Sequence, residues 1–336
     1  MREAMALAVV GDDVFDECTT VKELENNVAE MFGKQKGAFV CSGTMGNLAS
    51  VLAHCDERGQ EVILGDKSHI CLYEQGGIST LGGVHSRQLN NFSDGSFDIS
   101  NLRNVIRPLY DPHQPHTKLI CIENSHNFCA GAVVPEKFIR DVRSVCDEYN
   151  LSLHLDGARI FNAAVAEGKS VKELCKEFDT ASICLSKGVG APVGTVVVGD
   201  EKFIWKIKRL RKVLGGGWRQ PGHLAAACQV GLNDVYSRLA ADHRRAKRLG
   251  EAFENCGKDL FKVKPIQTNI IYIEVIKDGI TAKDLSDYLA EGPQPVMSAP
   301  FSETLLRFVT YSDIDDEMVN TTERKMAIVC EKLAKG

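Results

Sequence analysis

Two charged residues at the ends of apolar segments are the first candidates for chemistry. Asp156 ends the run "LSLHLD", and Lys187 follows "TASICLS" and precedes the glycine-rich stretch "GVGAPVG". Burying either charge costs free energy unless a partner is present. Desolvation also disfavours the charged form of a lysine, and so favours a neutral amine that can act as a nucleophile or form a Schiff base. A lysine that merely extends its amine to solvent is the ordinary alternative.

Asp156 and Lys187 together meet the requirements of one cofactor. Pyridoxal phosphate needs a lysine for its Schiff base and an aspartate that keeps the pyridine nitrogen protonated. The protonated ring then accepts electrons from the Cα atom of the substrate. The alternative for Asp156 is an ion pair with Arg159, which lies close by in the chain.

Two segments have compositions typical of phosphate-binding turns. "CSGTMGNL" (41–48) combines a strand end, a turn of small residues and a helix start. Such a turn presents backbone N–H groups and a hydroxyl to a phosphate, although its Ser and Thr residues equally serve as helix caps. "GVGAPVG" (188–194) has some likeness to a dinucleotide-binding glycine pattern. It precedes a strand, contains Pro192 and lacks a following helix, so that interpretation fails.

The elements that must position these residues alternate between apolar strands and helices. This alternation predicts an α/β fold with a mostly parallel sheet. The predicted strands lie at 37–43, 61–66, 118–124, 151–158, 180–186 and 194–200. Ligands of such sheets bind at the carboxyl ends of the strands. Four polar residues lie at such ends: Ser42, Asn124, Asp156 and Lys187.

The last third of the chain has a different organisation. A long helical stretch from about residue 222 leads to a strand at 268–275, a helix near 281–290, a strand at 305–312 and a terminal helix. We therefore predict a large domain over 1–232 and a small C-terminal α/β domain over 233–336. The segment 107–117 is predicted to be an exposed loop.

Composition narrows the class of protein further. The chain has 336 residues, is 44% hydrophobic and has a net charge of −5, so bulk attraction to nucleic acid or acidic membranes is not expected. The basic stretch "KFIWKIKRLRK" (202–212) fits an amphipathic helix with a solvated basic face. The 12 cysteines form no CxxC motif, and most lie in apolar runs, which is typical of reduced core residues. We expect no metal site, no membrane span and a cytoplasmic location.

Several colinear segments resemble one enzyme family. They are "VGDDVF", "SGTMGNL", "GDKSHICLYEQGG", "IENSHN", "LHLDGARIFNAA", "CLSKGVGAPVG", "LGGGWRQPGHLAAA" and "LLRFVT". The chain resembles the low-specificity L-threonine aldolases, which are pyridoxal phosphate enzymes of the aspartate aminotransferase fold type (fold type I). The resemblance covers nearly the whole chain. It implies a large domain with a mostly parallel seven-stranded sheet and a small α/β domain.

The resemblance also implies which residues bind the cofactor. Lys187 would form the Schiff base, Asp156 would pair with the pyridine nitrogen, and His69 would lie over the ring. Four further residues would help to hold the cofactor and its phosphate, the last reaching it from a neighbouring subunit: Ser42, Gly43, Thr44 and Arg219.

The substrate contacts are implied in the same way. Arg159, which is also close to the cofactor, and Arg307 would bind the substrate carboxylate through their planar guanidinium groups. His126 would lie near the substrate side chain. The base that removes the β-hydroxyl proton stays open between His69, His126 and an ordered water.

The implied reaction is retro-aldol cleavage of L-threonine or L-allo-threonine to glycine and acetaldehyde, within threonine catabolism and glycine biosynthesis. The family suggests a homotetramer, a dimer of dimers with shared active sites. Transamination, β-elimination and racemisation on the same scaffold would use the same Lys187 and Asp156. A truncated, cofactor-binding pseudoenzyme is the non-catalytic alternative.

The sequence departs from the family pattern at its beginning. Family members carry an N-terminal "RSDTVT"-like motif whose serine helps to bind the substrate carboxylate, and this chain starts after it, at "MREAM". Loss of one contact to a charged group would cost about 1.5–3 kcal/mol. The family's "GDDVY" tyrosine is Phe15 here, and "DECTT" replaces an acidic-Pro-Thr run.

Overall fold

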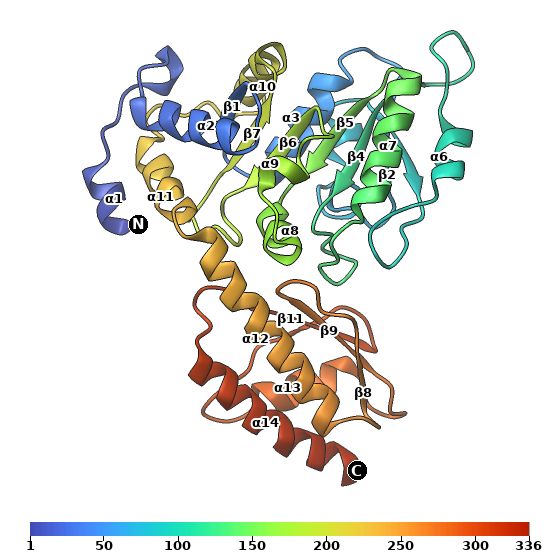
Figure 1. Ribbon diagram of the computed structural model, residues 1–336, viewed down its shortest axis with the longest axis vertical. Helices are drawn as coiled ribbons and strands as arrows, with labels where there is room; N and C mark the ends of the chain where they lie inside the picture. Colours follow the sequence, from blue (N-terminus) through green and yellow to red (C-terminus); the bar gives the residue numbers. More distant parts are fainter. Residues whose placement is uncertain (336) are drawn as a thin grey trace. The chain divides into compact units, whose positions relative to one another are not determined.

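The computed structural model describes residues 1–335 (Figure 1). The chain divides into two compact units. The large unit comprises residues 1–129 and 133–235, and the small unit comprises residues 130–132 and the chain from Tyr236 onward.

A seven-stranded sheet forms the centre of the large unit, in the order β1-β7-β6-β5-β4-β2-β3. Neighbouring strands from β6 to β3 are parallel, whereas β7 is antiparallel to both β6 and β1. This confirms the predicted mostly parallel sheet. The strands are β1 (Lys36–Val40), β2 (Gln60–Gly65), β3 (His85–Leu89), β4 (His116–Glu123), β5 (Ser152–Asp156), β6 (Thr180–Cys184) and β7 (Thr195–Gly199).

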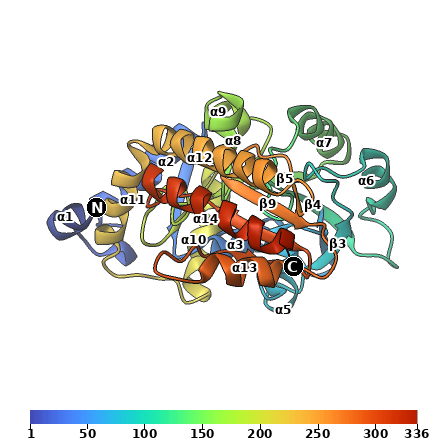
Figure 2. The same cartoon turned by 90° about the horizontal axis from the view of Figure 1, so that it is seen from below.

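Helices cover both faces of this sheet, and Figure 2 shows α2, α7 and α9 on one side and α3 and α10 on the other. The elements are α1 (Arg2–Leu7), η1 (Asp13–Phe15), α2 (Thr19–Met31), α3 (Gly43–His54), α4 (His69–Leu72), α5 (Gly77–Thr80), α6 (Ile99–Val105), α7 (Glu136–Tyr149), α8 (Ile160–Glu167), α9 (Val171–Leu174), α10 (Glu201–Val213) and α11 (Gly222–Leu232). Because both faces are covered, β2, β6 and β7 are buried along their whole length.

Helix α3 lies unusually close to the sheet. A Cβ atom at Gly46 would be 2.4 Å from the Ser182 Oγ atom on β6 and 3.1 Å from the Thr195 side chain on β7. Only glycine fits at this position without a shift of its neighbours. The apolar face of α3 packs with α10, β1 and β7 in a buried cluster that includes Ala49, Ala53 and Val197.

Strand β3 was not predicted from the sequence. The first four residues of its sequence, "HSRQL", are polar, and only Leu89 is buried, because β3 pairs on one side only and forms the edge of the sheet. Apolar patterning does not identify such a strand.

The basic stretch 202–212 forms the predicted amphipathic helix α10, with Phe203, Ile204 and Ile207 buried. One of its basic residues departs from the prediction. Arg211 is buried, because its guanidinium donates to the Phe39 carbonyl oxygen at 2.7 Å and to Asp13 Oδ2 at 2.8 Å. No helix in residues 1–335 is long and apolar enough to cross a membrane.

The small unit is an antiparallel sheet packed against helices. The strand order is β10-β11-β9-β8, and the elements are α12 (Val235–Cys256), β8 (Phe261–Val263), β9 (Ile270–Val275), α13 (Ala282–Ala290), β10 (Ala299–Pro300), β11 (Leu305–Val309) and α14 (Asp316–Lys335). Its own core includes Phe253, Ile271, Leu285 and Leu306. The long helical stretch expected after residue 222 is two helices, α11 and α12.

Candidate active site

One cavity of about 210 Å³ in the large unit brings together five of the predicted site residues. It is lined by Gly43, Thr44, Asn47, His69, Asp156, Ala158, Cys184, Ser186 and Lys187. Asp156 is the last residue of β5, and Lys187 follows β6. These two strands are parallel neighbours, so their carboxyl ends meet at the same edge of the sheet, as the sequence predicted.

Asp156 is a buried carboxylate, 2% exposed. Its Oδ2 atom accepts a hydrogen bond from Asn47 Nδ2 at 2.9 Å, and its Oδ1 atom accepts one from the Ala158 N–H at 3.1 Å. The hydrogen-bond partners of its two oxygens are therefore a neutral amide and a backbone N–H, and Asp156 forms no ion pair within residues 1–335. Burial, reinforced by the Glu123 carboxylate, raises the pKa of Asp156 to about 6.

Lys187 is partly exposed on the cavity wall. Its carbonyl oxygen accepts a hydrogen bond from the Gly190 N–H, which forms a tight turn in "KGVG". Gly190 has φ +77°, a conformation that favours glycine. The turn therefore fixes the backbone that carries the lysine, and the amine forms no ion pair among the described residues.

His69 begins the short helix α4 and is anchored by two buried carboxylates. Its backbone N–H donates to Glu123 Oε2 at 2.7 Å, and its ring Nδ1 atom is 2.8 Å from Glu74 Oε1. The hydrogen bond to Glu74 is the main reason why the pKa of His69 is raised; burial opposes it. With Nδ1 bound to Glu74, Nε2 is the ring nitrogen left for other partners.

The first turn of α3 forms another side of the cavity. The first N–H groups of a helix have no partner within the helix. Ser42, at the N-cap, accepts the N–H of Met45 at 3.1 Å, so its hydroxyl is a helix cap here. Gly43 and Thr44 line the cavity, and a Cβ atom at Gly43 would meet nothing closer than Thr195 Oγ1 at 3.9 Å. This end of the cavity therefore has room and backbone N–H groups for a phosphate.

Besides Ser42, which caps α3, four predicted site residues do not line this cavity. His126 is 1% exposed, its Nδ1 atom accepts the Cys129 N–H at 3.4 Å, and burial lowers its pKa. Arg219 is exposed; its guanidinium is 2.6 Å from Asp12 Oδ2 and lies over the Phe15 ring at 5.6 Å. Arg159 precedes α8. Arg307 belongs to β11 of the small unit, where its guanidinium lies over the Phe301 ring at 5.3 Å.

Three buried polar residues complete the site and were not singled out from the sequence: Asn47, Glu74 and Glu123. All three lie inside motifs that were noticed, "SGTMGNL", "SHICLYEQGG" and "IENSHN". A polar residue within an otherwise apolar element was the available signal, as for Asn47 between Gly46 and Leu48. A buried polar side chain needs a partner, and the partners here come from distant elements.

His69, Glu74 and Asp156 are also close enough to bind a metal ion, because one ligand atom of each lies within 4.8 Å of the others. The Asn47 amide already occupies both carboxylates, with its Nδ2 atom 2.9 Å from Glu74 Oε1 and 2.9 Å from Asp156 Oδ2. Hydrogen bonds therefore account for the cluster.

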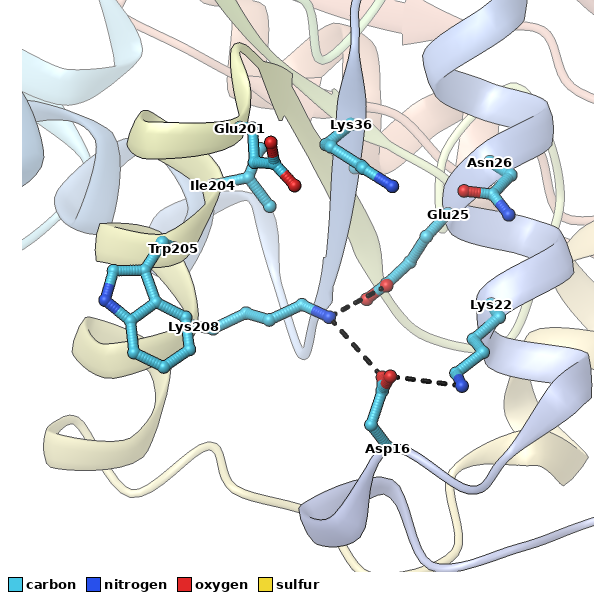
Figure 3. Close-up of a pocket in the computed structure, with 10 residues that line it drawn as sticks. Asp16, Lys22, Glu25, Asn26, Lys36, Glu201, Ile204, Trp205 and Lys208 are labelled. Atoms are coloured by element: carbon cyan, nitrogen blue, oxygen red, sulfur yellow. Dashed lines mark ion pairs between the residues drawn. The ribbon is translucent and has the colours of Figure 1, made fainter.

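A larger cavity of about 370 Å³ lies between α2, β1 and α10 of the same unit (Figure 3). The Lys208 amine reaches across it to Glu25 Oε2 at 3.3 Å and to Asp16 Oδ1 at 3.8 Å. Lys22 pairs with Asp16 at 3.0 Å. These ion pairs hold three segments of the chain together, and the cavity contains no unpaired buried charge of the kind found at Asp156.

The cavity at Asp156 also fits pyridoxal phosphate by the chemistry of its residues. It combines an amine, a buried carboxylate that forms no ion pair within residues 1–335 and helix N–H groups beside an open space, which match the aldehyde, the pyridine nitrogen and the phosphate of that cofactor.

Comparison with known proteins identifies the family of this chain. The family model described as beta-eliminating lyase matches residues 1–276. The protein named probable low-specificity L-threonine aldolase 2 of Arabidopsis thaliana is 47% identical over 95% of this chain and 91% of its own length. The low specificity L-threonine aldolase of Escherichia coli strain K12 is 38% identical over 95% of this chain and 92% of its own length. The solved structure of Leishmania major threonine aldolase shares the fold, with a TM-score of 0.78, 18% identity and coverage of 98% and 94% of the two chains.

Fold and site together define a pyridoxal phosphate-dependent lyase of fold type I. Within that class, the chain belongs to the low-specificity L-threonine aldolase family. The predicted fold, family, cofactor and type of enzyme are thereby confirmed. The individual roles of the site residues remain predictions.

Proposed function

We propose that this chain cleaves L-threonine and L-allo-threonine to glycine and acetaldehyde, using the cavity formed by Asp156, Lys187 and His69. One observation supports this assignment above the others: a fully buried carboxylate, Asp156, has no cationic partner within the described residues and faces a cavity shared with a lysine. A buried charge is normally paired, so its missing partner is a ligand. The protonated pyridine nitrogen of the cofactor is that partner.

Pyridoxal phosphate, when bound, supplies an electron-accepting ring that stabilises the carbanion left on Cα when the Cα–Cβ bond breaks. Lys187 binds the cofactor through its amine. Asp156 holds a proton on the pyridine nitrogen, and this ion pair lowers the pKa of the carboxyl from its raised value. Ser42, Gly43 and Thr44 form the phosphate end of the site, with the backbone N–H groups as donors.

His69 is the proposed general base for the β-hydroxyl proton. It lines the cavity, whereas His126 does not. Glu74 accepts the Nδ1 proton of the neutral ring, so Nε2 carries the lone pair that can take a proton. His126 has a buried Nε2 atom without a hydrogen-bond partner in residues 1–335, so this nitrogen is available to a polar group near the substrate side chain.

The remaining proposals follow from family membership. Arg159 and Arg307 bind the substrate carboxylate, and Arg219 reaches the phosphate of a neighbouring subunit in a homotetramer. Residues 1–232 act as the cofactor-binding domain and 233–336 as the small domain. The enzyme acts in threonine catabolism and glycine formation in the cytoplasm.

The test is aldehyde release from L-allo-threonine and from L-threonine by the chain saturated with pyridoxal phosphate. We expect acetaldehyde and glycine in equal amounts from both substrates. A keto acid in place of the aldehyde would show transamination or elimination, and inversion at Cα without cleavage would show racemisation. A chain that binds the cofactor and forms no product would be a pseudoenzyme. Each of the last three results would overturn the proposal.

A further inference from the structure

Asn47 lies at the junction of the two halves of the site. Its side chain is buried, with the residue 2% exposed. Its Nδ2 atom is 2.9 Å from Asp156 Oδ2 and 2.9 Å from Glu74 Oε1, and Glu74 in turn contacts His69 Nδ1 at 2.8 Å. One amide group therefore joins the carboxylate for the pyridine nitrogen to the carboxylate that orients the proposed base.

The direction of this amide follows from chemistry. An ionised carboxylate only accepts hydrogen bonds, so the two N–H bonds of the amide must point to Asp156 and Glu74. The carbonyl oxygen of Asn47 must then face the other way, where His154 Nε2 lies at 3.5 Å. This nitrogen must carry a proton in order to donate to the oxygen.

A chain of buried groups continues behind His154. Thr180 Oγ1 is 2.9 Å from His154 Nδ1 and 2.9 Å from His54 Nε2. Burial lowers the pKa of His154 to about 3 and that of His54 to about 4, so both rings are neutral and each carries one N–H. With the His154 proton on Nε2, the Thr180 hydroxyl donates to Nδ1 and accepts from His54. Each donor in this series of hydrogen bonds, from His54 through Thr180 to His154, thus points toward Asn47.

Close packing makes this arrangement possible. Gly46 allows α3 to approach β6, where a Cβ atom would be 2.4 Å from Ser182 Oγ. Asn47, the next residue, can therefore reach between β5 and the loop that carries Glu74. The contact spans 109 residues of sequence to Asp156 and 107 to His154.

We propose that Asn47 is a positioning residue of the aldolase site: its amide holds Asp156 and the Glu74–His69 pair in one arrangement, and the buried His154–Thr180–His54 chain fixes the direction of that amide. This inference rests on the proposed function. A hydrogen bond donated to a carboxylate favours its ionised form, which is the form that pairs with the pyridine nitrogen. Asn47 thereby opposes burial at Asp156 and keeps Glu74 an acceptor for the His69 ring.

The groups that set the charge of this cluster are few. Glu123 and Glu74 add negative potential at Asp156, whereas Lys187 and His69 oppose it. Loss of the Asn47 donor leaves the same charged groups in place and removes only a hydrogen bond donated by a neutral amide. Without this hydrogen bond, the ionised form of Asp156 is less favoured. The pH midpoint of the bound cofactor's absorbance should therefore shift, because Asp156 is the group that pairs with the pyridine nitrogen.

The experiment compares Asn47→Leu, Thr180→Val and a matched control, Thr117→Val. Thr117, like Thr180, is buried and lies at the amino end of a strand. Its hydroxyl is 2.6 Å from Glu61 Oε1 and accepts the backbone N–H of Arg107 at 2.9 Å, and it does not line the cavity. The measurements are the dissociation constant of pyridoxal phosphate, the pH midpoint of its bound absorbance and the melting temperature.

We expect Asn47→Leu to weaken cofactor binding by about ten- to a hundredfold, the range for loss of a hydrogen bond to a charged group, and to shift the pH midpoint. Thr180→Val should cause a smaller change of the same sign, because only the direction of the amide is released. Thr117→Val should lower the melting temperature and leave both cofactor readouts at the wild-type values.

If Asn47→Leu and Thr180→Val lower only the melting temperature, as the control does, Asn47 is a packing residue and the inference is wrong. If Asn47→Leu does not fold, the cofactor readouts of Thr180→Val are compared with those of Thr117→Val. Equal readouts for these two variants would show that the inference is wrong. Aldehyde release by the wild type, measured in parallel, tests the proposed function separately, because the cofactor readouts do not require turnover.

Discussion

Two cavities of the large unit, the one at Asp156 and the one at Lys208, differ in how their charges are satisfied. In the larger one, of about 370 Å³, Lys208 pairs with Glu25 and Asp16, and Lys22 pairs with Asp16. In the smaller one, of about 210 Å³, Asp156 lies near two further carboxylates, and no cation pairs with it in the described part of the chain. Size therefore does not identify the active site. The buried charge at Asp156 is what makes the smaller cavity the candidate site, because folding alone would not favour an unpaired buried charge.

The largest effect is expected at the smaller cavity, when Lys187 is replaced. We expect Lys187→Ala to lose the reducible Schiff-base absorbance of the cofactor and at least about a thousandfold in kcat, since the group that binds the cofactor covalently is removed. Absorbance with and without borohydride, followed by the aldehyde assay, measures both effects. Persistence of the reducible absorbance in Lys187→Ala would assign the Schiff base to another lysine.

Asp156→Asn should have two opposite effects: weaker cofactor binding and higher stability of the cofactor-free protein. Pyridoxal phosphate should bind about ten- to a hundredfold more weakly, because the charged partner of the pyridine nitrogen is lost. The cofactor-free variant should nevertheless be more stable than the wild type at neutral pH. Burial raises the pKa of Asp156 to about 6, above its ordinary value of about 3.9, so the folded state holds this proton more tightly than the unfolded state.

This proton makes the stability of the wild type depend on pH. The wild type loses stability, relative to Asp156→Asn, as the pH rises from about 4 through 6, by about 2–3 kcal/mol in total. Urea unfolding of both cofactor-free proteins at pH 4.5 and pH 7.5 measures this difference. If the two proteins differ in stability by the same amount at both pH values, burial does not raise the pKa of Asp156.

The smallest effect on activity is expected in the larger cavity. Lys208→Met removes the amine that pairs with the buried Glu25, whose pKa is raised mainly by burial. The free energy of unfolding should fall by about 1–3 kcal/mol, the cost of leaving a buried group without its partner, while kcat and cofactor binding stay unchanged. Lys202→Met, on the exposed side of the same helix, is the matched control and should alter neither. A fall in kcat for Lys208→Met would show that the larger cavity contributes to the reaction.

The fold was predictable where apolar patterning is strong. Strands such as β5 and β6 are buried on both faces, so their residues form continuous apolar runs that end at the site residues. Strand β3 was missed because an edge strand keeps polar residues. Arg211 was expected on a solvated face and is buried, since the partners that satisfy it, Asp13 and the Phe39 carbonyl, come from other elements.

The sequence alone predicted most of the strands and helices, the family and the candidate residues for the cofactor, because each depends on local composition or on short motifs. Lys187 and Asp156 at strand ends are of this kind. The tertiary structure alone decided which polar groups meet. The link from Asp156 through Asn47 and Glu74 to His69 joins β5, α3 and the loop after α4. No local pattern encodes such contacts, because strand order and helix packing create them only when the chain folds.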